Sequence, residues 1–314
     1  MGAVKNTREI AVLKAFHENI FFQDSSKADS FDAKLYYLLG KMEYYRILRD
    51  YEKVTLYSEK LFSLFDNNIK RFEDCASLYI YGLNIFIEGC HYMDRKQDVA
   101  SALHKIQTMP SLIGKKNLTD EIQIEIFEIY YIAATDACLH FREYKKGVGY
   151  VSAIEEGIKK YDNRLTPSFK MILLQNVACL YFGEEKYKLS LKWCNLVLNN
   201  PPTSNREDVL CIAKILNLLI HLELRNNLIL PYIIKSTYRF LYKKKRVYQF
   251  ETLFLKYIKL FLKTDTKKEQ VELLNFFKAD LKTLENDQIE NVIFNDIDLI
   301  GWIDKKAGKN FPFS

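Results

Sequence analysis

Hydrophobic residues recur through most of the chain at steps of three and four positions, the spacing that places them on one face of an α-helix. Between Phe31 and Phe65, two such runs are separated by Leu48, Arg49 and Asp50, which predicts a helical hairpin. Further pairs of runs are expected at 69–90 with 93–108, 119–141 with 144–161, 167–183 with 185–199, 206–225 with 227–243, and 246–263 with 267–284. The pattern predicts an all-α chain of helix pairs, preceded by an N-terminal helix.

The composition agrees with long helices. Among the 314 residues there are only 11 glycines and 6 prolines, whereas 48% are hydrophobic. Sandwiches, barrels and doubly wound sheets need many tight turns that depend on these two residue types, so we exclude them. Thr166 followed by Pro167, and the capping boxes Ser204–Glu207 and Thr266–Glu269, mark helix starts at the expected positions.

The hairpin turns repeat along the chain. Tyr51, Tyr144 and Tyr187 each follow a charged residue at the point where the second helix of a pair is expected to begin. Tyr51 and Tyr144 are 93 residues apart, which is about two units, and Tyr187 follows after another 43. Leu228 continues the series at 41. The spacing predicts a repeating unit of roughly 41–47 residues, each a pair of antiparallel helices.

The segment Met171–Pro202 resembles a tetratricopeptide repeat. The matching positions are Leu174, Ala178 and Tyr181 in the first helix, Tyr187 in the turn, and Ser190, Cys194, Val197 and Pro202 in the second half. The stretch Ile215–Glu251 is similar to uncharacterised bacterial proteins of the tetratricopeptide type. The resemblance implies a right-handed α-solenoid of antiparallel helix pairs over residues 1–284, with residues 285–314 as an acidic capping segment packed on it. Because the period exceeds the usual length of about 34 residues, a HEAT-like array stays open as an alternative.

In a tetratricopeptide solenoid the first helices of the pairs line an inner groove, and the resemblance assigns six residues of this chain to it. They are Tyr36, Leu39, Glu43, Arg46, Gln175 and Phe182. Such a mixed set suits an extended peptide or an amphipathic helix. The alternative is that several of these side chains only pack against a neighbouring helix.

Positive charge is concentrated in one segment. The chain has a net charge of +6, but residues 233–270 alone contain eleven Lys or Arg and three acidic residues, a net +8. Lys256, Lys259 and Lys263 share a helix face by their spacing. The candidate basic patch within 235–268 consists of Lys235, Arg239, Lys243, Lys244, Lys245 and Arg246, with Tyr238, Phe240, Tyr242 and Tyr248 interleaved.

Three interpretations of this patch are open. Lysines that neutralise phosphates, together with tyrosines that stack on bases, would form a nucleic-acid site. An acidic partner protein would dock on the same charges. In the third interpretation the patch is a solvated face that residues 283–304, with six acidic residues and no Lys or Arg, neutralise within the chain.

The sequence contains no recognised pattern of enzyme chemistry. It has no GxGxxG, GxxxxGK, HExxH or GxSxG sequence, and its six cysteines are scattered without a CxxC pair. We therefore expect no catalytic residue, no metal site and no cofactor. Charged residues interrupt the apolar stretches of the N-terminus, and no window is long and apolar enough to span a bilayer. We expect a cytoplasmic protein without a membrane partner.

These features predict a non-catalytic scaffold for protein–protein interaction. It would bind a peptide or a partner protein through the solenoid groove, the basic patch or both, and the basic residues favour an acidic partner. One alternative is a regulatory protein that senses a peptide or small ligand and changes shape. Another is nucleic-acid binding through the basic patch.

Overall fold

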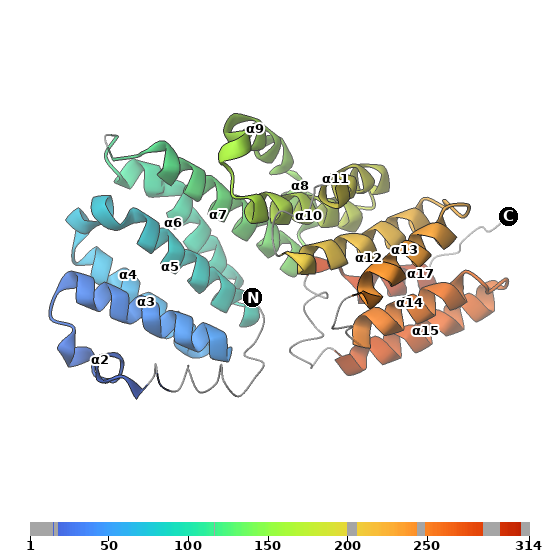
Figure 1. Cartoon of the computed structure of the whole chain (residues 1–314), viewed down its shortest axis with the longest axis horizontal. Helices are drawn as coiled ribbons and strands as arrows, with labels where there is room; N and C mark the ends of the chain where they lie inside the picture. The colour runs from blue at the N-terminus through green and yellow to red at the C-terminus, as the bar shows by residue number, and fades with distance from the viewer. Residues whose placement is uncertain are drawn as a thin grey trace. The chain divides into compact units, whose positions relative to one another are not determined.

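The computed structural model of the chain describes residues 15, 18–115, 117–199, 206–243, 249–284 and 296–308. Every regular element in these ranges is a helix, which confirms the predicted all-α class. The described residues form two compact units, one within Met1–Ala137 and Glu156–Leu165, the other within Cys138–Glu155 and Thr166–Ser314. Helices α7 (Asp120–His140) and α9 (Val151–Tyr161) contribute residues to both units. Figure 1 labels the helices along the chain.

The first unit is built on α3 to α6. Its helices are α2 (Ile20–Gln23), α3 (Phe31–Leu48), α4 (Tyr51–Asp66), α5 (Phe72–Tyr92) and α6 (Lys96–Leu112), with 3-10 turns at Ser25–Lys27, Ile69–Arg71 and Asp162–Arg164. Helix α3 packs on α4, α4 on α5 and α5 on α6, and α3 also packs on α5. Phe65 lies fully buried in the core, where its ring centroid is 5.0 Å from that of Phe72 and 4.9 Å from that of Tyr79. The helices are therefore packed in neighbouring pairs, and the first helices of two successive pairs are in contact.

The second unit repeats this arrangement. Its helices are α8 (Tyr144–Val148), α10 (Pro167–Gly183), α11 (Tyr187–Asn199), α12 (Glu207–Glu223), α13 (Leu230–Tyr242), α14 (Gln249–Phe261), α15 (Lys267–Leu284) and α17 (Leu299–Gly308). From α10 to α15, each helix packs on the one that follows it. Helix α10 also packs on α8 and α12. Helix α17 packs on α15. Contact between α10 and α12 is again contact between the first helices of successive pairs.

The same turn closes five of the hairpins. In each, one residue adopts the left-handed conformation, its N–H donates to the carbonyl three residues earlier, and the next N–H donates to the carbonyl five residues earlier. This is the Schellman motif, which satisfies the free carbonyls at the end of the first helix. The left-handed residues, with φ of 54–58°, are Arg49, Asp94, Arg142, Glu185 and Arg225.

These turns explain the spacing seen in the sequence. Successive left-handed residues are 45, 48, 43 and 40 positions apart, and each spacing lies within one residue of the predicted range of 41–47. The 93 residues between Tyr51 and Tyr144 correspond to two units, and the turn at Asp94 is the turn between them. It was missed because Lys96 stands two residues after the turn, where three other hairpins have a tyrosine.

The helix expected over 144–161 is broken into α8 and α9. Gly149 and Tyr150 separate the two helices. A Cβ atom on Gly147 would lie 2.4 Å from Cδ2 of Leu180, so glycine at this position lets α8 approach α10 closely. Glycine also weakens a helix. Two glycines within three residues therefore give both the close approach and the break.

Candidate binding surfaces

Two of the predicted groove residues of α3 belong to a polar network with α5. The guanidinium of Arg46 lies 2.7 Å from the carboxylate of Glu43 and 3.5 Å from that of Glu88. Tyr81 donates a hydrogen bond to Glu43. Burial raises the pKa of Glu88, and the charge of Arg46 opposes this shift. Glu43 and Arg46 thus join two first helices of the array.

The other two residues of this set lie in different environments. Tyr36 is 64% exposed, whereas Leu39 is buried in the core. The predicted positions of α3 are therefore one exposed ring, one core residue and two members of the network. Tyr81 and Glu88 were not predicted from the sequence, because finding them requires knowing which face of α5 meets α3.

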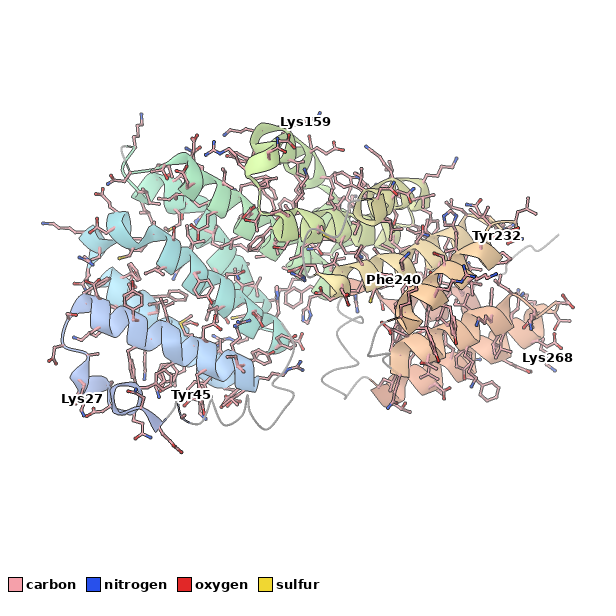
Figure 2. The ribbon with its side chains drawn as sticks, in the orientation of Figure 1. Lys27, Tyr45, Lys159, Tyr232, Phe240 and Lys268 are labelled. Atoms are coloured by element: carbon pink, nitrogen blue, oxygen red, sulfur yellow. The ribbon has the colours of Figure 1, made fainter. Side chains whose placement is uncertain are left out.

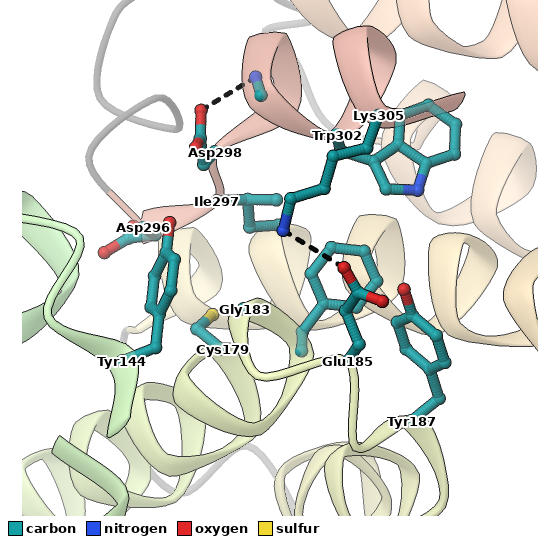
Figure 3. Close-up of a pocket in the computed structure, with 12 residues that line it drawn as sticks. Tyr144, Cys179, Gly183, Glu185, Tyr187, Asp296, Ile297, Asp298, Trp302 and Lys305 are labelled. Atoms are coloured by element: carbon teal, nitrogen blue, oxygen red, sulfur yellow. Dashed lines mark hydrogen bonds and ion pairs between the residues drawn. The ribbon is translucent and has the colours of Figure 1, made fainter. Parts of the chain in front are cut away.

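Gln175 and Phe182, the predicted groove residues of α10, are both buried. The amide of Gln175 donates to Sγ of Cys179 at 3.2 Å. Phe182 and Cys179 line a small pocket with a cavity volume of about 30 Å³. Ile297 and Trp302, from the C-terminal part of the chain, line the same pocket (Figure 3). The chain itself covers this stretch of α10.

The described part of the candidate basic patch lies on α13 and continues onto α14. Six basic residues of these two helices and their ends are exposed: Lys235, Arg239, Lys243, Lys256, Lys259 and Lys263. Among residues 230–243 and 249–263 the only acidic residue is Glu251, which is buried. The predicted patch residues Lys244, Lys245 and Arg246 lie outside the described residues. We call the six exposed cations, with the tyrosines of α13 described next, the basic surface.

Three tyrosines of α13 are part of the basic surface. Tyr232 is 75% exposed, Tyr242 is 70% exposed and Tyr238 is 45% exposed. The rings of Tyr238 and Tyr242 are stacked with centroids 5.6 Å apart, and Nζ of Lys259 lies 4.7 Å from the centre of the Tyr238 ring. This last contact joins α14 to α13. Phe240, also on α13, instead lies under Nζ of Lys214 of α12 at 5.1 Å (Figure 2).

Acidic residues of the C-terminal segment pair with cations outside the basic surface. Asp304 binds Lys278 of α15 at 2.6 Å, and Asp298 lies 3.8 Å from Arg142. Residues 285–295, which hold the other acidic residues of this segment except Asp296, lie outside the described residues. Neither of the two ion pairs neutralises Lys235, Arg239 or the lysines of α14.

Nothing in the described ranges gathers three or more His, Cys, Asp or Glu side chains in a geometry suited to a metal ion. Within the same ranges, no helix has a stretch both long and apolar enough to span a bilayer. None of the six cysteines, all of which lie in the described ranges, forms a disulfide, and all but Cys75 are buried. Burial raises the pKa of the Cys90 and Cys194 thiols to about 12.

A thiol-labelling experiment at pH 8 is expected to separate Cys75 from the other cysteines. A pKa of about 12 leaves roughly one Cys90 or Cys194 thiol in ten thousand ionised at this pH, and only the thiolate reacts. We expect rapid labelling of Cys75 by a chromogenic disulfide reagent and labelling of all 6 cysteines only in denaturant. Rapid reaction of several thiols in the folded chain would contradict this burial.

No family model, curated protein or solved structure matches this chain. The sequence located the α13 half of the basic surface from the spacing of Lys235, Arg239 and Lys243. The spacing of Lys256, Lys259 and Lys263 likewise indicated that these three lysines share one helix face, which is the α14 half. That the two helices belong to one surface follows only from their packing.

Proposed function

We propose that this protein is a non-catalytic interaction scaffold that binds an acidic segment of a partner protein on the basic surface. The observation that carries the proposal is the presence of six exposed cations on α13, α14 and their C-terminal ends, where residues 230–243 and 249–263 contain no exposed acidic residue. Like charges gathered at one surface favour a ligand of the opposite charge, because they raise its rate of encounter and select against cationic partners.

A helical-repeat framework supports this role. We propose a tetratricopeptide-like, right-handed solenoid of antiparallel pairs. The five identical turns and the contact between first helices of successive pairs are the support for it. A rigid array of this kind holds exposed side chains in fixed positions, which lowers the entropy cost of binding an extended segment. Six cysteines without a disulfide in the described residues agree with a reducing compartment, and we propose the cytoplasm.

The composition of the basic surface also indicates how such a segment would bind. Exposed ion pairs contribute at most about 1 kcal/mol each, so the six cations alone contribute at most about 6 kcal/mol, which corresponds to a Kd of about 40 μM. Tyr232 and Tyr242 add apolar area with a polar tip, as the tyrosines of protein interfaces commonly do. The partner segment is therefore expected to combine Asp or Glu with apolar side chains.

Single-strand nucleic-acid binding is the second candidate, and one observation favours it. The rings of Tyr232 and Tyr242 are largely exposed beside cations, and bases stack on such rings while lysines neutralise phosphates. The same cations would bind an acidic protein segment or a nucleic acid, so a binding measurement is needed to distinguish the two functions.

The test compares three labelled probes by fluorescence anisotropy. They are a peptide rich in Glu and Leu, the same peptide with every Glu replaced by Gln, and a single-stranded RNA of similar charge. We expect the acidic peptide to bind best and to lose at least about fivefold in affinity between about 50 and 300 mM salt, because exposed charges are screened. Binding of the Gln peptide with equal affinity would overturn the proposal. Tighter binding of the RNA than of the acidic peptide would replace it with the second candidate.

A further inference from the structure

Helix α17 is held in the second unit by two anchors that meet one carboxylate. The indole Nε1 of Trp302 donates to Oε1 of Glu223 at 2.5 Å, and Nζ of Lys306 lies 2.8 Å from the same oxygen. The side chains of Lys306 and Glu223 are each only 8% exposed. Glu223 is the last residue of α12. A buried ion pair with a second donor is a specific contact, since an isolated carboxylate at this depth would be costly.

Other contacts fix the direction of α17. Its start is capped by Asp298, whose Oδ1 accepts a hydrogen bond from the N–H of Gly301 at 2.9 Å. Lys305 forms an ion pair of 3.2 Å with Glu185, the left-handed residue of the α10–α11 turn (Figure 3). The cations of α17 therefore face two carboxylates of the unit, although residues 283–304 as a whole are acidic.

The surface beneath α17 includes predicted groove positions of the repeat that best matches the tetratricopeptide pattern. Cys179, Phe182 and Tyr187 line it from α10 and α11, opposite Ile297 and Trp302. A pocket that is partly open to solvent remains between them. Phe182, Ile297 and Trp302 are all buried, as expected where an amphipathic helix lies on an apolar surface.

We propose that the surface formed by Cys179, Phe182, Glu185, Tyr187 and Glu223 is a second binding site, here called the α17 cradle. Its ligand class is a short amphipathic helix that carries Trp followed four residues later by Lys, and α17 is its resident intramolecular ligand. Positions four apart lie on one helix face, so indole and ammonium reach Glu223 together. Two carboxylates select a cationic ligand, the opposite of the basic surface, so this site does not depend on the function proposed above.

The lengths of α17 and of its connection support a displaceable ligand. Helix α17 has only 10 residues, and a helix this short is marginal in water unless it is docked. Eleven sequence positions, 285–295, separate α15 from Asp296. A ligand that belongs to the same chain competes intramolecularly, at an effective concentration well above micromolar. A competing helix at micromolar concentration therefore binds weakly while α17 is in place.

The experiment supplies α17 as a free peptide to the full-length chain. The probe is a fluorescent peptide with the sequence of residues 296–308. It is titrated into the unmodified chain and into the variant W302A/K306A, which lacks both anchors of its own α17. We expect the variant to bind the peptide at least about tenfold more tightly, because its own α17 keeps only its contacts with α15 and Glu185 and competes less. Equal affinity for both chains would overturn the proposal.

A further pair of substitutions tests the contact itself. Adding Glu223→Gln to W302A/K306A is expected to weaken peptide binding at least about tenfold, because the charge that both anchors use is removed. Glu207→Gln, at the other end of α12 and exposed, serves as the matched control and should leave the affinity unchanged. Peptide binding that is insensitive to Glu223→Gln would place the peptide elsewhere and overturn the proposal.

Hydrogen exchange in the unmodified chain covers the case in which W302A/K306A does not fold. A displaceable α17 opens without the rest of the unit, so its amides should exchange at least about tenfold faster than the central amides of α12. Equal protection of α17 and α12 would mean that α17 is a permanent part of the unit, and the proposal would fail.

Discussion

Replacing Phe65 by alanine is expected to lower the free energy of unfolding of the first unit by about 3–5 kcal/mol. Phe65 has no exposed area, and its ring lies edge-on to those of Phe31 and Tyr79 and tilted against that of Phe72. The substitution removes buried apolar area, leaves a cavity and breaks three aromatic contacts at once. The rings come from α3, α4 and α5, so the loss affects two helix pairs.

Native-state hydrogen exchange of α4 and α5 amides measures this effect without requiring the whole chain to unfold in one step. Protection of the slowest amides should fall by at least about a hundredfold. The matched control is Phe276→Ala on α15, since Phe276 is 66% exposed, and its effect should stay within about 0.5 kcal/mol. A loss of less than about 1 kcal/mol for Phe65→Ala would mean that the cluster repacks around the missing ring.

Neutralising four cations of the basic surface is expected to weaken binding of the acidic peptide about 30-fold. The substitutions are Lys235→Gln, Arg239→Gln, Lys256→Gln and Lys259→Gln. Each exposed ion pair contributes about 0.5 kcal/mol, so four together contribute about 2 kcal/mol. The salt dependence of the remaining binding should also become shallower, because fewer charges are screened. Fluorescence anisotropy at about 50 mM salt measures both.

The control for this variant must have the same change in net charge. Four lysines on other helices are exposed and available for it: Lys34, Lys145, Lys159 and Lys188. Their replacement by Gln should weaken the acidic peptide less than about threefold, through the long-range field alone. If both variants lose affinity equally, the peptide responds to the overall charge of the protein, and the basic surface is not a site.

Most of the helix pairs could be predicted because each helix carries its own apolar face. The spacing around Leu35 and Leu38 gave α3, and both residues are buried in the structure. The pair at α5 and α6 was found in the same way, but the turn at Asp94 was not recognised as a copy of the others. A Schellman turn is specified by backbone geometry and not by one residue type, so Lys96 in place of a tyrosine concealed it.

The binding surfaces were harder to predict from the sequence, because each is formed by residues of different helices. Lys235 and Arg239 were found by their spacing, whereas the contact of Lys259 with Tyr238 depends on how α14 packs on α13. The charge of the C-terminal segment was averaged over many residues. The acidic segment that was counted, 283–304, ends just before Lys305 and Lys306, whose contacts are with Glu185 and Glu223. The α17 cradle follows from those two ion pairs.

The recurring Schellman turn has a consequence for how the chain folds. Each turn is closed by hydrogen bonds that span no more than five residues, and apart from the contacts of α17 with its cradle, the packed pairs described above join helices that are adjacent or one apart in the sequence. Such a topology has a low contact order, and low contact order favours rapid folding. A hairpin can therefore form soon after its second helix leaves the ribosome. The order of folding is expected to follow the order of synthesis.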